Sequence, residues 1–349
     1  REMLQAAIDY SQMYVTGSIG PGRHNEGFTR DYDLPNDTAY AETCAAIGLF
    51  LWMHRMVQID GDGKYGDVME RALYNGILSS VSLDGQRYFY ENPLSVDRQN
   101  EGFRRKPHHR QTWYGTACCP PNVTRLLASL GGYIYSQSES DAVVHLYVQG
   151  QGELQVAGQT VTIAQESNYP WDGAITIRVQ PEQPARFGLR LRVPGWCHQA
   201  TVQVNGETWG AKPERGYVRI ERQWAAGDTV ALNLSMPIER VYAHSKVSAD
   251  RGRVALQRGP IVYCLESADN GTDLDSNSLP RASALEAHYE PKLLGGVVSI
   301  SGEAQRPAAT DSMYANRPLA TKTVAFKAIP YCLWDNRDSG DMLVWINES

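Results

Sequence analysis

The chain has 349 residues, of which 42% are hydrophobic and 21% charged, with a formal net charge of −6 and a pI near 5.8. This length allows two or three domains with ample cores. The acidic balance and the lack of a long basic cluster argue against nucleic acid and anionic membrane surfaces as partners. The sequence also has no apolar run of about 18 residues, so it contains no segment typical of a membrane span.

Residues 1–136 have mainly a helical pattern. The chain begins inside a predicted helix over 1–20, so we expect the true N-terminus to lie upstream. Start signals and apolar residues at 3.6 spacing predict further helices, at 37–59, 64–82 and 120–136. Long loops, 17–36 and 84–117, separate them, and loops of this length usually carry function.

After about residue 137 the hydrophobic period changes to two. Short alternating strands divided by Gly, Pro, Asn and Asp turns predict a β-sandwich over 137–240. Asn205-Gly206 lies between two such runs and predicts a tight hairpin. A second set of strands, including "RVALQRGPIVYCLE", predicts a further β-sandwich over 241–349.

Three places in the helical part carry side chains with chemical potential. The loop "PGRHNEGFTRDYDLPND" contains Glu26, "AETCAA" contains Glu42 and Cys44, and "YGTACCPP" contains Cys118 and Cys119. Three thiolates and one carboxylate suit a tetrahedral zinc ion better than magnesium or calcium, which prefer oxygen ligands. The spacing argues against this set, because residues i and i+2 of a regular helix point about 200° apart.

Simpler interpretations remain open for each of these residues. Glu26 and Glu42 are equally consistent with solvated carboxylates, and Cys44 with a buried helical side chain. Aromatic residues of the second long loop suit either a sugar face or a core: Tyr88, Phe89, Tyr90, Trp113 and Tyr114. The remaining cysteines, Cys197, Cys264 and Cys332, lie in predicted strands and are interpreted as core residues. Six scattered cysteines do not form a disulfide scaffold and favour a reducing compartment.

Long motifs in the chain are more specific than these spacings. The segments "NEGFTRDYDLPNDTAYAETCAAIGLF" and "WYGTACCPPNVTRLLASLGGYIY", followed by "RVPGW" and "ALQRGPIVYCLE", resemble glycoside hydrolase family 127, the bacterial β-L-arabinofuranosidases. The resemblance implies a multi-domain protein with α structure before β structure. Its expected domains are part of an (α/α)6 catalytic barrel over 1–136 and two β-sandwiches over 137–240 and 241–349.

The resemblance also assigns roles to the candidate residues. It implies that Cys118 is the nucleophile and Glu26 the general acid/base of a retaining hydrolase that releases β-L-arabinofuranose, or a similar furanoside, from an oligosaccharide or glycoside. It implies Zn²⁺ as the cofactor, with Glu42, Cys44, Cys118 and Cys119 as its ligands. The bacterial cytoplasm is the expected location, and a homodimer stays open.

Three expectations qualify this assignment. The predicted helices are too few for a whole barrel, so this chain alone is expected to be weakly active or inactive. One alternative is a non-catalytic carbohydrate-binding protein with a structural zinc site, in which the ion is fully coordinated. Another is a carbohydrate-binding β-sandwich module that is docked by the helical part.

Overall fold

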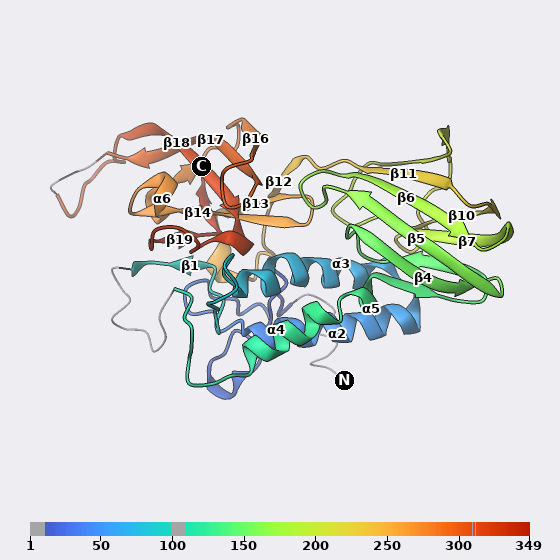
Figure 1. Cartoon of the computed structure of the whole chain (residues 1–349). Helices are drawn as coiled ribbons and strands as arrows, with labels where there is room; N and C mark the ends of the chain where they lie inside the picture. The colour runs from blue at the N-terminus through green and yellow to red at the C-terminus, as the bar shows by residue number, and fades with distance from the viewer. Residues whose placement is uncertain (1–10, 99–108, 309, 311) are drawn as a thin grey trace. The chain divides into compact units, whose positions relative to one another are not determined.

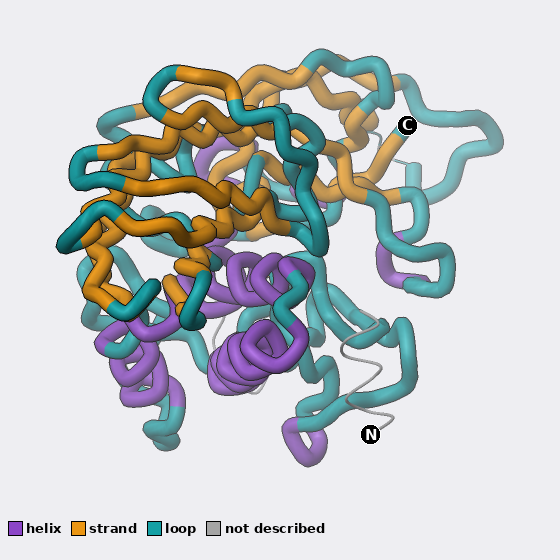
Figure 2. The backbone as a smooth tube through the Cα atoms, turned by 90° about the vertical axis from the view of Figure 1, so that its right-hand side faces the viewer, coloured by secondary structure: helices purple, strands orange, loops and turns teal. Residues whose placement is uncertain are grey.

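The computed structural model describes residues 11–98, 109–308, 310 and 312–349. The chain divides into two compact units. Each unit combines segments from the first 136 residues with one of the two β regions. The first unit comprises residues 1–46, 72–120 and 238–349, and the second comprises residues 47–71 and 121–237. Figures 1 and 2 show that strands and loops make up most of the described chain.

The helices and strands have the following bounds. The α-helices of the described residues are α2 (Thr43–Asp60), α3 (Gly63–Arg71), α4 (Cys119–Ala128), α5 (Gly131–Ile134) and α6 (Ser267–Asn270). The strands up to the middle of the chain are β1 (Ser95–Val96), β2 (Tyr135–Gln137), β3 (Asp141–Val144), β4 (Gly150–Val156), β5 (Gln159–Ser167), β6 (Ala174–Pro181), β7 (Ala185–Arg192), β8 (Ala200–Val204), β9 (Glu207–Thr208), β10 (Tyr217–Trp224) and β11 (Asp228–Leu234). The remaining strands are β12 (Ile238–Val241), β13 (Arg253–Arg258), β14 (Ile261–Glu266), β15 (Ser278–Leu279), β16 (Leu285–Glu290), β17 (Val297–Pro307), β18 (Thr321–Pro330), β19 (Met342–Leu343) and β20 (Ile346–Glu348).

The second unit contains the predicted β-sandwich. A four-stranded sheet has the order β10-β7-β3-β2, and a six-stranded sheet has the order β4-β5-β6-β11-β8-β9. Alternate residues of both sheets enter one core, among them Leu189, Ile177 and the fully buried Trp224. The period-two pattern therefore predicted this domain correctly, because one face of each sheet is apolar.

The Asn205-Gly206 hairpin is also confirmed. Val204 pairs with Glu207, and the two turn residues have φ values of 51° and 85°. A two-residue turn with positive φ at both positions matches the twist of antiparallel strands, and Asn and Gly adopt it most readily.

In the first unit, the prediction of a second sandwich is wrong. The strands β14, β18, β17, β15, β20 and β13 pair in that order, and β13 pairs back onto β14 through Gln257↔Val262 and Arg258↔Ile261. This pairing closes the sheet into a six-stranded barrel. Closure satisfies the edge strands directly, whereas a sandwich needs a second sheet to cover its apolar face. Alternation along single strands cannot distinguish the two arrangements.

Two predicted helix boundaries are also wrong. Residues 11–20 form turns with a Met13↔Ile19 bridge instead of a helix, while residues 1–10 lie outside the described part. The helix predicted from 37 begins only at Thr43, after Ala41 with φ of 39°. Within the described residues no (α/α)6 barrel is present, since the helices there are few and short apart from α2.

The predicted helix over 64–82 changes type along its length. Helix α3 continues as a π-helix over Ala72–Ile77 and then as a 3-10 turn. The buried Asn75 in this wider segment donates to the Pro260 carbonyl at 2.9 Å and accepts from the Val262 amide at 2.8 Å. A π segment often marks a position where a side chain is needed outside the regular helical register. Here it lets Asn75 satisfy the turn that joins β13 to β14.

The buried carboxyl of Asp250 makes the stability of the first unit depend on pH. Burial raises the pKa of Asp250 from 3.8 to about 6, and Asn36 donates to its carboxylate at 2.6 Å. The folded state binds the Asp250 proton more tightly than the unfolded state does. The free energy of unfolding therefore falls as the pH rises from about 4 to about 6 and the folded protein loses this proton. We expect Asp250→Asn to stabilise the protein at pH 7 by on the order of 2–3 kcal/mol and to have no such effect below about pH 4.

The measurement is urea unfolding at several pH values. The exposed Asp338→Asn serves as the matched control in the same unit. Equal stabilities of Asp250→Asn and wild type at pH 7 would contradict the expectation.

Candidate active site

Glu42 and Cys44 lie at the start of helix α2. Glu42 precedes the helix and forms a bridge with Glu91, while the Thr43 amide donates to the Tyr90 carbonyl at 3.1 Å. Glu42 is therefore in extended backbone and only Cys44 lies in the first helical turn. The objection from helical spacing does not apply, because the pair straddles the helix boundary.

The two adjacent cysteines lie at the beginning of helix α4. Cys119 is the first helical residue and is fully buried, whereas Cys118 precedes the helix and is half-buried. The loop before them is fixed by Tyr88, which exchanges backbone hydrogen bonds with Gln111 and donates from its hydroxyl to the Thr116 carbonyl at 3.2 Å. The change from loop to helix between the two cysteines lets adjacent side chains approach the same point.

Four predicted ligand residues meet in this way. The candidate donor atoms of Glu42, Cys44, Cys118 and Cys119 all lie within 4.8 Å of one another. Cys119 Sγ is 3.7 Å from Cys44 Sγ and 3.6 Å from Cys118 Sγ. Glu42 Oε1 is 3.3 Å from Cys118 Sγ and 3.9 Å from Cys119 Sγ.

These separations fit a tetrahedral zinc ion. Zinc–sulfur bonds of about 2.3 Å in tetrahedral geometry place two sulfurs about 3.8 Å apart. Burial raises the pKa of Cys118. The pKa of Cys119 is also raised, mainly by its contact with Cys44 and secondly by burial. Without a cation these thiols stay protonated at neutral pH, whereas a bound metal ion would deprotonate them. The donor set therefore suits a thiophilic divalent metal.

Glu26 lies next to this cluster. It ends the 3-10 turn His24–Glu26 with φ of 49°, and paired Gly22 and Gly27 hold the base of its loop. A positive φ is unfavourable for glutamate, and such strain is often found at functional positions. The surrounding loop thus holds this side chain in a conformation that an unconstrained chain would avoid.

Two phenols connect Glu26 to the cysteines. Tyr40 and Tyr90 donate to Glu26 Oε1 at 2.8 and 3.2 Å, and Tyr90 Oη lies 3.5 Å from Cys118 Sγ. The Tyr90 distances of 3.2 and 3.5 Å limit the separation of Glu26 Oε1 and Cys118 Sγ to at most 6.7 Å. Burial raises the pKa of both tyrosines, so both hydroxyls stay protonated and act as donors.

The roles of these two tyrosines were not predicted from the sequence. Tyr88, Phe89 and Tyr90 are buried, as the core interpretation expected, whereas Trp113 is 61% exposed. Tyr40 stands two residues before Glu42 in a non-helical segment, with φ of 39° at the intervening Ala41. The sequence predicted a helix over these residues, so it offered no signal that the two side chains would lie at the same site.

The other predicted cysteines lie elsewhere. Cys264 and Cys332 are buried, and Cys197 is half-buried against the sandwich core, as expected for packing residues. The strand prediction holds only for Cys264 in β14, because Cys332 lies in the 3-10 turn Tyr331–Leu333 and Cys197 lies in a loop. All six cysteines are free thiols.

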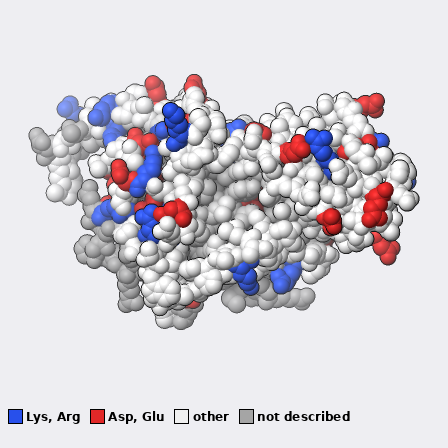
Figure 3. All heavy atoms as spheres, in the orientation of Figure 1, with Lys and Arg blue, Asp and Glu red and all other residues white. Residues whose placement is uncertain are grey.

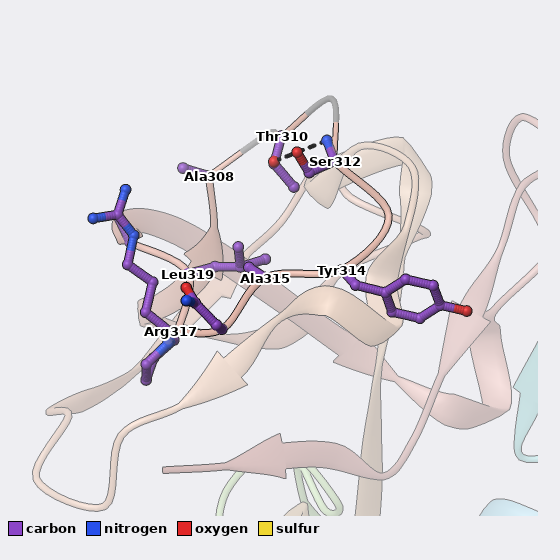
Figure 4. A pocket seen from close by; sticks show the side chains of 10 residues that line it. Ala308, Thr310, Ser312, Tyr314, Ala315, Arg317 and Leu319 are labelled. Carbon is purple, nitrogen blue, oxygen red and sulfur yellow. Dashed lines mark hydrogen bonds between the residues drawn. The ribbon is translucent and has the colours of Figure 1, made fainter.

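A hollow of about 1080 Å³ at the β17–β18 connection offers a poorer chemical site (Figure 4). Its lining consists mainly of small and uncharged side chains, and Arg317 is its one charged residue among those described. Tyr314 points away from the hollow in Figure 4 and is 87% exposed. This hollow has no acid/base pair in the described residues, so the cysteine cluster remains the better candidate.

On the face shown in Figure 3, Lys and Arg side chains are intermixed with Asp and Glu instead of gathering in one basic patch. Among the described helices, none combines the length and apolar character needed to cross a membrane.

Three protein-family models match consecutive parts of the chain. The β-L-arabinofuranosidase GH127 catalytic-domain model matches residues 2–132, the GH127 middle-domain model matches 141–236, and the glycoside hydrolase family 127 C-terminal-domain model matches 238–347. The chain belongs to glycoside hydrolase family 127. The three matches together extend from residue 2 to residue 347, so the family resemblance covers nearly the whole chain.

Individual family members are similar over the same extent. A non-reducing end β-L-arabinofuranosidase of Bifidobacterium longum is 38% identical over 96% of this chain and 53% of its own length. The crystal structure of a GH127 β-L-arabinofuranosidase from Geobacillus stearothermophilus T6 has a TM-score of 0.96 and 49% identity, covering 100% of this chain and 56% of that one. A GH127 β-arabinofuranosidase structure has a TM-score of 0.90 and 38% identity, covering 97% and 54%. The chain therefore spans about half the length of these relatives.

Proposed function

We propose that this protein is a retaining glycoside hydrolase that releases β-L-arabinofuranose, or a similar furanoside, from an oligosaccharide or glycoside. The observation that carries the proposal is the shared contact of Tyr90, whose hydroxyl meets both Glu26 and Cys118. A carboxylic acid and a sulfur nucleophile at this separation can act on opposite sides of one glycosidic bond. Retaining glycosidases with two carboxyl groups use a separation of about 5–5.5 Å, which the upper limit above accommodates.

The proposed reaction has two displacements. Cys118 Sγ forms a bond to the anomeric carbon as the glycosidic C–O bond breaks, and Glu26 gives its proton to the departing oxygen. Glu26 then takes a proton from water, whose oxygen attacks the same carbon and displaces Cys118 Sγ. Both phenols donate to Glu26 Oε1, so we assign the transferred proton to Oε2. Two inversions at one carbon retain its configuration.

Zinc is the proposed cofactor, held by Glu42, Cys44, Cys118 and Cys119. When bound, it supplies positive charge that keeps the sulfurs as thiolates. The fit of the sulfur–sulfur and sulfur–oxygen distances supports this assignment. A reducing location such as the bacterial cytoplasm is proposed with it, because Cys44 and Cys119 lie 3.7 Å apart and an oxidant would join them.

The alternative is a carbohydrate-binding protein with a purely structural zinc site. The half-buried position of Cys118 beside fully buried Cys119 favours catalysis, because a nucleophile must be reached by the substrate. We further propose that an (α/α)6 barrel forms only in a longer protein, with domain limits near residues 136 and 240. On this proposal the present chain alone has little activity.

Zinc content tests the ligand assignment. We expect about one zinc per chain by elemental mass spectrometry, because four ligands fill a tetrahedral site. Cys119→Ser should lose the ion at least tenfold faster to a chelator, because Cys119 Sγ lies within 3.9 Å of the donor atoms of all three other candidate ligands. Cys197→Ser is the matched control, a half-buried cysteine outside the cluster. A zinc-free wild type with freely alkylated Cys118 and Cys119 would contradict the assignment.

A further inference from the structure

A second cavity lies in the second unit, against the outer face of the four-stranded sheet. It measures about 520 Å³ and is bounded by the end of helix α2 and strands β2, β3, β7 and β10. Besides Val57 and Val143, its lining is mainly polar and includes Gln58, Ser136, Asp141, His145, Arg190 and Tyr217. A volume of this order exceeds that of a single sugar ring, and the mixture of rings with hydrogen-bonding groups is typical of small-molecule sites.

The cavity has an uncompensated positive charge. Arg190 on β7 pairs in register with Arg219 on β10, so the two guanidinium groups stand on the same face. Arg219 is neutralised by Asp141 at 2.7 Å and Glu221 at 2.5 Å. Arg190 contacts the Tyr217 ring at 4.9 Å, and within the described ranges it has no ion pair or side-chain hydrogen bond. Directly opposed like charges destabilise a sheet, so an anion beside Arg190 would be favourable.

Two hydroxyl groups of the lining are held by one buried imidazole. The buried His145 contacts Ser136 Oγ at 2.8 Å through Nε2 and Tyr217 Oη at 2.7 Å through Nδ1. A neutral imidazole donates through one nitrogen and accepts through the other. One of the two hydroxyls therefore donates to the ring and the other accepts from it. The pair presents opposite hydrogen-bonding capacity, which matches a sugar hydroxyl that both donates and accepts.

We propose that this cavity binds a carboxylate-bearing sugar, a uronic acid residue of a saccharide. The Arg190 guanidinium binds the carboxylate through its planar fork of donors. The hydroxyls of Ser136 and Tyr217 bind ring hydroxyls. Because the lining carboxylate of Asp141 is paired with Arg219, Arg190 is the lining cation left for a ligand, and one cation suits a monoanionic polyol better than a phosphate with nearly two charges. This site is separate from the cysteine cluster and does not rest on the proposed hydrolase function.

The test compares glucuronate, galacturonate, glucose and inorganic phosphate by saturation-transfer NMR and calorimetry with the whole chain. We expect saturable binding of at least one uronate, at least tenfold tighter than glucose and phosphate, and weakened by added salt. Arg190→Gln should reduce uronate binding to the level of glucose. Arg178→Gln is the matched control, an exposed arginine of the other sheet paired with Glu166 at 3.0 Å, and should bind as wild type.

The comparison of ligands on the wild-type chain does not depend on any variant folding. Thermal melting curves establish that both variants are folded before their binding is compared. Equal binding of phosphate and uronate, no saturable uronate binding, or undiminished binding by folded Arg190→Gln would each overturn the proposal.

Discussion

Replacing Cys118 by alanine is expected to abolish hydrolysis of an aryl β-L-arabinofuranoside by a protein that carries this chain within a complete catalytic domain. The loss in kcat should be on the order of 10⁵-fold or more, as for other enzymes deprived of a covalent nucleophile. The physical reason is that the half-buried Cys118 Sγ lies 3.5 Å from the Tyr90 hydroxyl that also meets Glu26. Steady-state kinetics with a 4-nitrophenyl glycoside measures the effect.

Glu26→Gln separates loss of chemistry from loss of metal. Glu26 is not among the four clustered ligands, so this variant should retain the zinc content of wild type. Its activity should fall most for poor leaving groups, because these depend on a proton from the general acid. Cys197→Ala is the control for cysteine removal and should keep full activity. Substantial turnover by zinc-loaded Cys118→Ala would contradict the nucleophile assignment.

The donor set was predictable from the sequence, but its geometry was not. Three cysteines and a glutamate were identifiable as candidate ligands by their chemistry, and the structure brings all four together. The four side chains can meet because helix α2 begins at Thr43. Glu42 therefore lies outside the helix, and the separation of about 200° between residues i and i+2 in a helix does not apply to Glu42 and Cys44. This boundary depends on the Glu42↔Glu91 bridge, a contact between residues far apart in the sequence. Local signals such as Asn36-Asp37 contain no information about that contact.

The two β domains show the same limit. Alternation predicted strands in both, and in the second unit two apolar sheet faces do form a sandwich. In the first unit the single pairing of β13 with β14 converts a sheet into a barrel. Inward-facing residues alternate along the strand in either case, so only the pairing of strand edges distinguishes them.

A buried ion cluster in the second unit leads to the second large prediction. Arg192 on β7 is fully buried and donates to Glu70 Oε1 and Asp67 Oδ1, each at 2.5 Å. Glu70 also accepts from the Tyr169 hydroxyl at 2.6 Å and from Trp196 Nε1 at 2.9 Å. These bonds join helix α3 to the sandwich. The contact needs glycine at position 66, where a Cβ atom would lie 2.6 Å from Arg192 Cδ.

Glu70→Gln is expected to destabilise the protein by about 3–5 kcal/mol, measured by urea unfolding. The substitution keeps the shape but leaves the buried Arg192 charge with Asp67 as its remaining anion, and it places an amide among three donors. Burying a charge without its partner costs far more than losing an exposed pair. The matched control is Asp60→Asn, which breaks the exposed Arg215–Asp60 pair in the same unit and should leave the urea midpoint nearly unchanged. Similar losses for the two variants would show that burial does not govern the strength of this cluster. A larger loss for Glu70→Gln would identify the Arg192 cluster as what fixes α3 against the sandwich.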